Sequence, residues 1–396
     1  MMRSTLGLCT TLIALSGFVY ACSSLGADSS FAGGESSDPT PRGGADAGTG
    51  GAAPNTAMPA DLAPVDNAVI LVHAAKSQSF RLCFEKEPDR RPAPDSDLMP
   101  EANVVGVEVG SAVRLGPLKG APGNVFLFEE PLIRAFYPQF GGAGAGPTCG
   151  QLLSNQNLGK LSVPLGAVTA DLSSGVHLLV VRGCPGNTPL RTYSVAECGT
   201  GWVAATGNLT VKEITLSGAR RPLDGNLPAQ VVNLSQPLDS ARAGRDVVVS
   251  FGDLAATDAQ HVKVVSNPGL FGNAEPPQPV QLAYASTDIA IYGSTGFRVA
   301  LVAASDGGAG TKVLDESLAQ IQKLSSPRDV PPSYFGAASN YALLLLGDPD
   351  AKLADGGADK DDRRNLHFLA VPVIEPKADG GADGGDPSDG GAASTP

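Results

Sequence analysis

Between residues 66 and 375 the chain consists of short apolar runs separated by clusters of Gly, Pro, Asn and Asp. The runs are rich in Val, Ile and Leu, which favour strands, and the clusters are typical of turns. A doubly wound α/β fold would need a helix between most of the strands, and such helices are missing. For this chain of 396 residues we therefore predict an all-β fold with two antiparallel β-sandwich domains, at 66–218 and 226–375.

The apolar runs give the expected strands of each domain. In the first domain they are 67–74, 80–84, 102–109, 124–128, 176–182 and 207–216. In the second domain they are 229–234, 245–251, 261–265, 280–285, 288–293, 297–304, 341–347 and 366–373. The run YALLLLG, residues 341–347, has no polar face and is expected to lie centrally in its sheet. In 207–216 the apolar residues change parity between Val211 and Ile214, which predicts a β-bulge.

One short helix is predicted, in the second domain. A single helical face would carry the apolar residues Leu314, Leu318, Ile321 and Leu324. The acidic residues Asp315 and Glu316 come early in this segment and Lys323 comes late. That order of charges matches the helix dipole, so it supports a helix over the whole segment.

Both ends of the folded region have compositions that cannot form a core. Residues 22–65 are mostly Gly, Ala, Ser, Asp, Pro and Thr, and residues 376–396 are rich in Asp and Gly. Such segments bury too little apolar surface to fold alone. We therefore expect a flexible linker at 22–65 and a disordered tail at 376–396. Calcium binding by the Asp-rich loops is kept as a third functional hypothesis.

Residues 1–21 have the pattern of an export signal, with a basic start and an apolar stretch from Leu6 to Val19. The following stretch VYAC, residues 19–22, resembles the lipobox of bacterial lipoproteins, in which the cysteine receives a diacylglycerol. Tyr20 departs from that pattern, because a small residue is usual there. The resemblance implies a lipid anchor on Cys22, and a soluble secreted protein is the alternative.

The cysteine count supports the lipid anchor independently. Cleavage before Cys22 would leave an odd number of cysteines in an oxidising compartment. Lipidation of Cys22 leaves an even set: Cys83, Cys149, Cys184 and Cys198. A disulfide from Cys184 to Cys198 would close a turn-rich segment, and Cys83 would then pair with Cys149. We prefer this connectivity among the three that the set allows.

The stretches DNAVILVHAA (66–75), YALLLLGDPD (341–350) and LHFLAVPV (366–373) lie near the two ends of the folded region. They resemble a family of bacterial extracytoplasmic domains of unknown function. Its members are β-sandwiches that open with a strand ending in a Val-His-Ala-Ser-Pro-like motif and are common in cell-surface lipoproteins. Here Ala75 and Lys76 replace the Ser-Pro. The resemblance implies a β-sandwich and no catalytic residues.

The sequence contains no catalytic or metal-binding pattern. The histidines, none of them paired at helical spacing, are His73, His177, His261 and His367. Neither CxxC nor the hydrolase signature Gly-x-Ser-x-Gly is present. We therefore expect no metal, no cofactor and no enzymatic activity. The alternative is an envelope hydrolase whose site is assembled from distant loops.

These observations together predict a non-catalytic lipoprotein with a binding or structural role. A formal net charge of −12 at pH 7 argues against nucleic acid as a partner. Ser23 stands where inner-membrane lipoproteins carry Asp, which favours the outer membrane of the cell envelope. The charged loop 85–102, with Arg90 and Arg91, is the candidate contact surface, because loops on rigid sandwiches often carry recognition. Besides the membrane, we expect an envelope protein or a glycan as partner.

Overall fold

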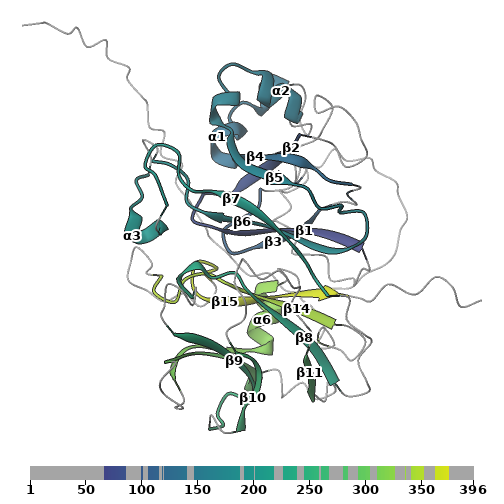
Figure 1. Cartoon of the computed structure of the whole chain (residues 1–396), viewed down its shortest axis with the longest axis vertical. Coiled ribbons are helices and arrows are strands. Elements are labelled where there is room, and N and C mark those ends of the chain that lie inside the picture. Colours follow the sequence, from purple (N-terminus) through teal and green to yellow (C-terminus); the bar gives the residue numbers. More distant parts are fainter. Residues whose placement is uncertain are drawn as a thin grey trace, which may run out of the picture. The chain divides into compact units, whose positions relative to one another are not determined.

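The computed structural model confirms the prediction of an all-β fold (Figure 1). It describes residues 67–85, 100, 106–115, 118, 120–140, 147–187, 191–199, 201–217, 226–238, 245–257, 260–266, 280–283, 293–303, 310–325, 335, 340–351 and 362–373. The export signal, the linker and the tail lie outside these residues, and all described residues belong to one compact unit.

The first half of the folded region, 67–217, forms two sheets. One has the strand order β3-β1-β6-β7 and the other the order β2-β4-β5. The strands are β1 (Asn67–Ala75), β2 (Phe80–Phe84), β3 (Ala112–Leu115), β4 (Gly123–Glu129), β5 (Val163–Val168), β6 (Gly175–Gly183) and β7 (Thr210–Thr215). Three short helices accompany them: α1 (Glu130–Arg134), α2 (Cys149–Ser154) and α3 (Val195–Cys198).

The second half, 226–373, forms the other two sheets, in the orders β11-β8-β14-β15 and β10-β9-β12-β13. The strands are β8 (Asn226–Asn233), β9 (Asp246–Asp253), β10 (Val262–Ser266), β11 (Val280–Ala283), β12 (Thr295–Val302), β13 (Thr311–Ser317), β14 (Asn340–Leu346) and β15 (His367–Val373). Helix α6 (Leu318–Ser325) follows β13 directly. The expected strand 288–293 lies almost entirely outside the described residues.

Three apolar cores connect these sheets. One lies between the two sheets of the first half, and another between the two sheets of the second half. A third, the inter-repeat core, joins sheet β3-β1-β6-β7 to sheet β11-β8-β14-β15. Strands β1 and β14 therefore have both faces buried, which explains why each is apolar along most of its length. The two sandwiches consequently share a core.

The two central strand pairs correct the expectation of antiparallel sheets. Strand β1 runs parallel to β6, and β8 runs parallel to β14, while every other described pair of named strands is antiparallel. The chain leaves β1, builds the neighbouring sheet and returns as β6 in the same direction. Hydrophobic patterning gives the faces of a strand but not its direction, so the sequence could not show this.

The two halves have the same topology and form an internal repeat. In each half the first strand pairs with a parallel partner and an antiparallel edge strand, and the parallel partner pairs with the last strand. Gly183 and Gly347 fix the equivalent residues, because each packs against the carbonyl oxygen of an asparagine, Asn208 or Asn365. Two residues before these glycines, Val181 pairs with His73 and Leu345 pairs with Asn233, so His73 and Asn233 are equivalent. We call 67–217 the first repeat and 226–373 the second. Strand β10 belongs to the second repeat and has no equivalent in the first.

The predicted helix over 314–324 begins four residues later than expected. Leu314, Asp315 and Glu316 belong to β13, and α6 starts at Leu318. The ladder between β12 and β13 has a register shift at Val313, so Leu314 pairs with Val299 and Lys312 with Ala300. The resulting β-bulge turns Leu314 and Glu316 to the same side as Leu318. Their spacing therefore imitates a helical face.

The bulge predicted within 207–216 is wrong. Strand β7 pairs with β6 in a continuous register from Thr210 to Thr215. The change of parity has another cause, since Leu209 and Val211 pack in the core of the first repeat. Ile214 and Leu216 pack in the inter-repeat core on the opposite face. The strand thus serves two cores without a bulge.

Candidate functional site

The four cysteines of the folded region form two disulfides. Of the three connectivities that the sequence left open, this is the preferred one. Cys83 on β2 is joined to Cys149 at the start of α2, and Cys184 after β6 is joined to Cys198 at the end of α3. The first disulfide lies in a small core built by residues of β2, β4, α1 and α2. Figure 1 shows these two helices beside sheet β2-β4-β5. The lipid site Cys22 and the contact-loop residues Arg90 and Arg91 lie outside the described residues.

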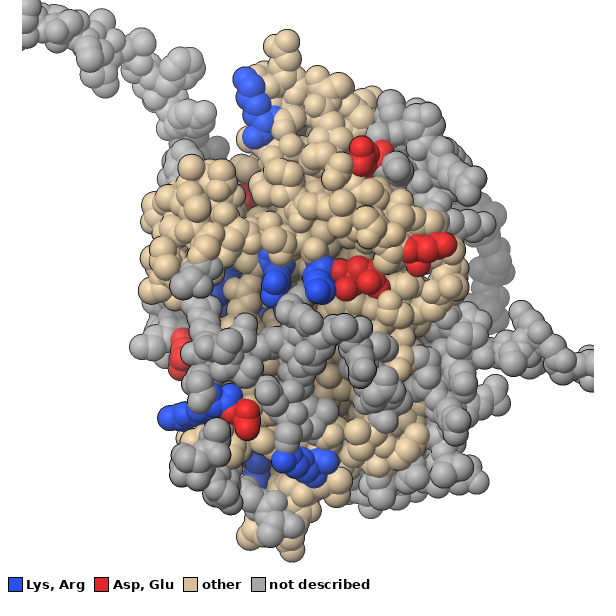
Figure 2. Space-filling model, in the orientation of Figure 1, with Lys and Arg blue, Asp and Glu red and all other residues tan. Residues whose placement is uncertain are grey.

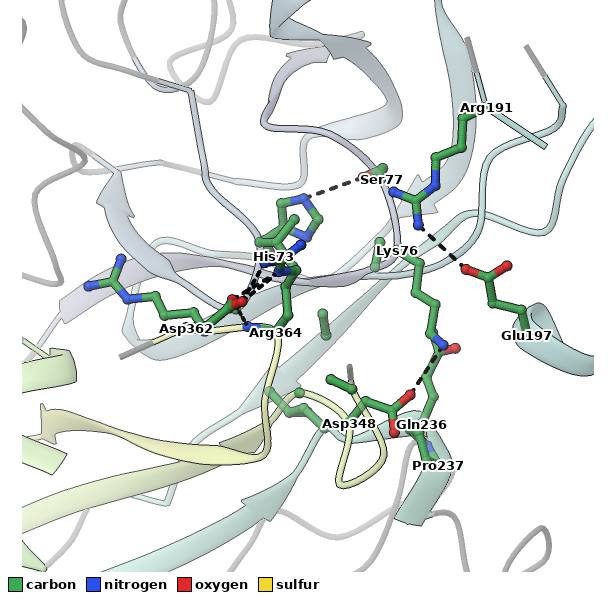
Figure 3. Close-up of a pocket in the computed structure, with 18 residues that line it drawn as sticks. His73, Lys76, Ser77, Arg191, Glu197, Gln236, Pro237, Asp348, Asp362 and Arg364 are labelled. Atoms are coloured by element: carbon green, nitrogen blue, oxygen red, sulfur yellow. Dashed lines mark hydrogen bonds and ion pairs between the residues drawn. The ribbon is translucent and has the colours of Figure 1, made fainter. Parts of the chain in front are cut away.

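A cavity of about 270 Å³ lies at the junction of the two repeats (Figure 3). Its lining comes from residues that end or follow three inner strands, namely 73–77 at the end of β1, Leu234, Gln236 and Pro237 after β8, and 347–348 after β14. The loops at 109–110 and 362–364 complete it together with Ala351, Arg191 and Glu197. We call it the junction cavity. No sequence motif indicated it, because its residues come from both repeats.

Two glycines allow the loops around the cavity to come close together. Gly110 has φ +66°, and a Cβ there would lie 2.2 Å from the carbonyl oxygen of Arg363. Gly347 has φ +84°, and its Cβ would lie 2.0 Å from the carbonyl oxygen of Asn365. Any larger residue at either position would therefore meet backbone as well as an unfavourable φ.

Three ion pairs surround the junction cavity (Figure 3). Lys76 of the first repeat reaches Asp348 of the second at 3.3 Å, and Arg191 reaches Glu197 at 3.4 Å. The third pair, Asp362 and Arg364, has three hydrogen bonds of 2.5 to 2.9 Å. The cavity is therefore lined by charges of both signs that are matched in pairs.

A fourth cation, Arg363, also lines the cavity but is engaged elsewhere. Its Nη2 donates a hydrogen bond of 2.9 Å to the carbonyl of Leu324 on α6, and its Nη1 lies 3.8 Å from Glu108. Burial lowers the pKa of Arg363 below its usual value, and the charge of Glu108 opposes that shift. This arginine therefore ties the cavity wall to α6.

A Ser–His contact lies at the wall of the cavity. Nε2 of the fully buried His73 is 3.3 Å from the hydroxyl of Ser77 and 3.0 Å from the carbonyl of Gln78. A carbonyl only accepts hydrogen bonds, so Nε2 carries the proton and donates it. Burial lowers the pKa of His73 to about 4, which leaves the ring neutral at pH 7. In this tautomer Nε2 cannot take a proton from Ser77, as a general base would have to.

The repeat explains what His73 does. Its hydrogen bond to the carbonyl of Gln78 spans five residues, and the equivalent Asn233 donates to the carbonyl of Leu238, also five residues on, at 3.2 Å. Both side chains thus close the turn that follows the first strand of their repeat. The conserved geometry within one chain indicates a structural task for His73.

The other histidines are dispersed. His367 on β15 bonds the carbonyl of Gly110 at 2.9 Å and so links the repeats, while His177 on β6 bonds Glu213 at 2.7 Å. His261 precedes β10 and contacts the carbonyl of Thr257. Within the described ranges no cluster of His, Cys, Asp or Glu has the geometry to hold a metal ion. The Asp-rich segments behind the calcium hypothesis lie mostly outside those ranges.

The described surface shows no large area of one charge on the face in Figure 2, where basic and acidic side chains are scattered. Among the described residues no helix has the length and apolar character needed to cross a membrane. No protein-family model matches the chain, and no curated protein matches it either. The family resemblance noted from the sequence therefore stays a prediction.

Proposed function

We propose that the protein is a non-catalytic lipoprotein of the cell envelope that binds a ligand in the junction cavity between its two repeats. The observation that carries the proposal is the cavity itself, because its charged residues are matched in ion pairs and its histidine is in the wrong tautomer for proton transfer. Such a lining favours recognition over chemistry.

The envelope location is supported by independent features of the chain. The stretch around Cys22 resembles a lipobox and follows an apolar export segment. Two disulfides in one folded unit are typical of proteins outside the reducing cytosol. A lipid on Cys22 and the linker of 22–65 would hold the sandwiches away from the membrane surface. We place the anchor in the outer membrane, because Ser23 stands after Cys22 where inner-membrane lipoproteins carry Asp.

The anchor is tested by fractionation and mass spectrometry of the expressed full chain. We expect wild-type protein in the membrane fraction with a lipid mass on Cys22, and we expect Cys22→Ala in the soluble fraction. The matched control Cys9→Ala removes a cysteine within the export signal and should leave the fractionation unchanged. An unmodified Cys22 in soluble wild-type protein would contradict the anchor.

The non-catalytic role is tested separately with a panel of ester, peptide and glycoside substrates. We expect no turnover above that of a heat-denatured sample. Turnover by the purified protein that is abolished by a point mutation in the folded region would replace this proposal with the envelope-hydrolase alternative.

A further inference from the structure

The junction cavity presents opposite charges side by side at a position fixed by the backbone. Lys76 comes from the first repeat, where its N–H donates to the carbonyl of Gly183 and its carbonyl accepts from the hydroxyl of Tyr193. Asp348 comes from the second repeat, where its Oδ1 accepts from the N–H of Asp350 and its Oδ2 faces Lys76. The N–H of Asp348 donates to the carbonyl of Arg364, so both backbones are held before any ligand enters.

The contact between these two side chains is weak enough to be rearranged. Nζ of Lys76 and Oδ2 of Asp348 are 3.3 Å apart, and the side chains retain 27% and 23% of their exposure. An ion pair of this kind contributes little on its own, because water screens both partners. A ligand can therefore contact both charges without displacing a strong interaction.

The paired charges restrict which ligand fits. An anion next to Lys76 would also approach Asp348, and a cation next to Asp348 would approach Lys76, so each would be repelled as well as attracted. A molecule that carries both charges avoids this conflict. In an α-amino acid the ammonium nitrogen and the nearest carboxylate oxygen are about 3 Å apart. That spacing is close to the 3.3 Å between the two protein atoms.

We propose that the junction cavity binds a free α-amino acid, with its carboxylate on Lys76 and its ammonium group on Asp348. This inference rests on the binding role proposed above. Ala74, Val109, Leu234 and Pro237 also line the cavity and offer an apolar surface for an aliphatic side chain. The volume of about 270 Å³ accommodates a molecule of this size and is small for a longer peptide.

The test is isothermal titration calorimetry on the purified full chain in detergent. The probes are L-alanine, L-valine and L-leucine, with N-acetyl-L-valine, L-valinamide and the dipeptide Val-Val as comparisons. We expect saturable binding of at least one free amino acid. Each capped form lacks one charge and should bind at least about tenfold more weakly, and the dipeptide should bind more weakly because its charges are further apart.

Variants test the two residues directly. Lys76→Met and Asp348→Asn should each weaken binding at least about tenfold, while Lys160→Met, at an exposed lysine that does not line the cavity, should not change it. The capped ligands need only wild-type protein, so the test stands even if a variant fails to fold. Equal binding of free and capped forms, or no binding of any of the three amino acids, overturns this inference. The Cys22 result is unaffected by either outcome.

Discussion

The carboxyl group of Glu316 is buried in a place where its ionised form is unfavourable. It is 4% exposed at the end of β13, and its Oε2 accepts a hydrogen bond of 2.7 Å from the N–H of Phe368 on β15. Burial raises the pKa of Glu316 to about 8, and this hydrogen bond only partly opposes the shift. The folded protein therefore holds Glu316 protonated at pH 7, whereas an unfolded chain would have it ionised.

This residue makes stability depend on pH. Between the unfolded pKa of 4.5 and the folded pKa of about 8 the native state binds more protons than the unfolded state, so stability falls as pH rises. At pH 7 the raised pKa of Glu316 lowers the free energy of unfolding by about 3 kcal/mol. We expect Glu316→Gln to raise the free energy of unfolding at pH 8 and to change it little at pH 5, measured by urea denaturation. Asp246→Asn, at an exposed carboxyl, is the control. A gain of equal size at both pH values would contradict the assigned pKa.

Most strands that the sequence predicted from regular apolar runs are present, and several that it missed have an irregular backbone. The expected strand 102–109 is an exception, because its described part makes only an isolated bridge at Val107 and strand β3 follows at Ala112–Leu115. Strand β5 contains Pro164 and Gly166, which disfavour strands, yet it lies at a sheet edge where proline is tolerated. Gly166 has φ +101° beside a register shift in the ladder to β4. Helix α2 has a Thr148–Gln151 capping box, but it is too short to show a period. Local irregularities of this kind depend on partner strands, so the sequence alone cannot show them.

The α3 element depends on its disulfide. Cys184 and Cys198 close a loop of 14 residues that carries Arg191 and Glu197 to the junction cavity, whereas Cys83 and Cys149 are 66 residues apart. A longer closed loop removes more entropy from the unfolded chain. We expect the free energy of unfolding to fall by about 3 kcal/mol in the Cys184→Ser/Cys198→Ser double variant and by about 4 kcal/mol in the Cys83→Ser/Cys149→Ser double variant.

Denaturation in urea measures both losses, and limited proteolysis locates them. The Cys184→Ser/Cys198→Ser variant should gain cleavage sites between 184 and 207, where Tyr193 and Trp202 pack against this disulfide. Proteolysis confined to other segments would mean that the loop is held by its remaining contacts.

The internal repeat and the junction cavity are the features of the molecule that could least be predicted from the sequence. The repeats share short signals, such as Gly183 followed later by Asn208-Leu209 and Gly347 followed by Asn365-Leu366. The spacing between these signals differs because the loops differ in length. The cavity needs the register of both repeats at once, so no single motif could indicate Lys76 and Asp348 as neighbours.

The inter-repeat core predicts that the two repeats unfold together. Buried apolar side chains of both repeats fill it, among them Ile70, Val180, Leu344 and Val371. Each contributes about 1.5–3 kcal/mol through burial, so separating the repeats would cost much of their stability. A substitution that destabilises one repeat should therefore destabilise the other by the same amount.

Trp202, the only tryptophan, reports on the first repeat alone. Leu343→Ala opens a cavity in the core of the second repeat, with an expected loss of about 2–5 kcal/mol. If the repeats unfold together, urea midpoints from Trp202 fluorescence and from far-UV circular dichroism will fall by the same amount. Val262→Ala, at an exposed site on β10, should shift neither. A Leu343→Ala variant whose fluorescence midpoint stays at the wild-type value would show two independent folding units.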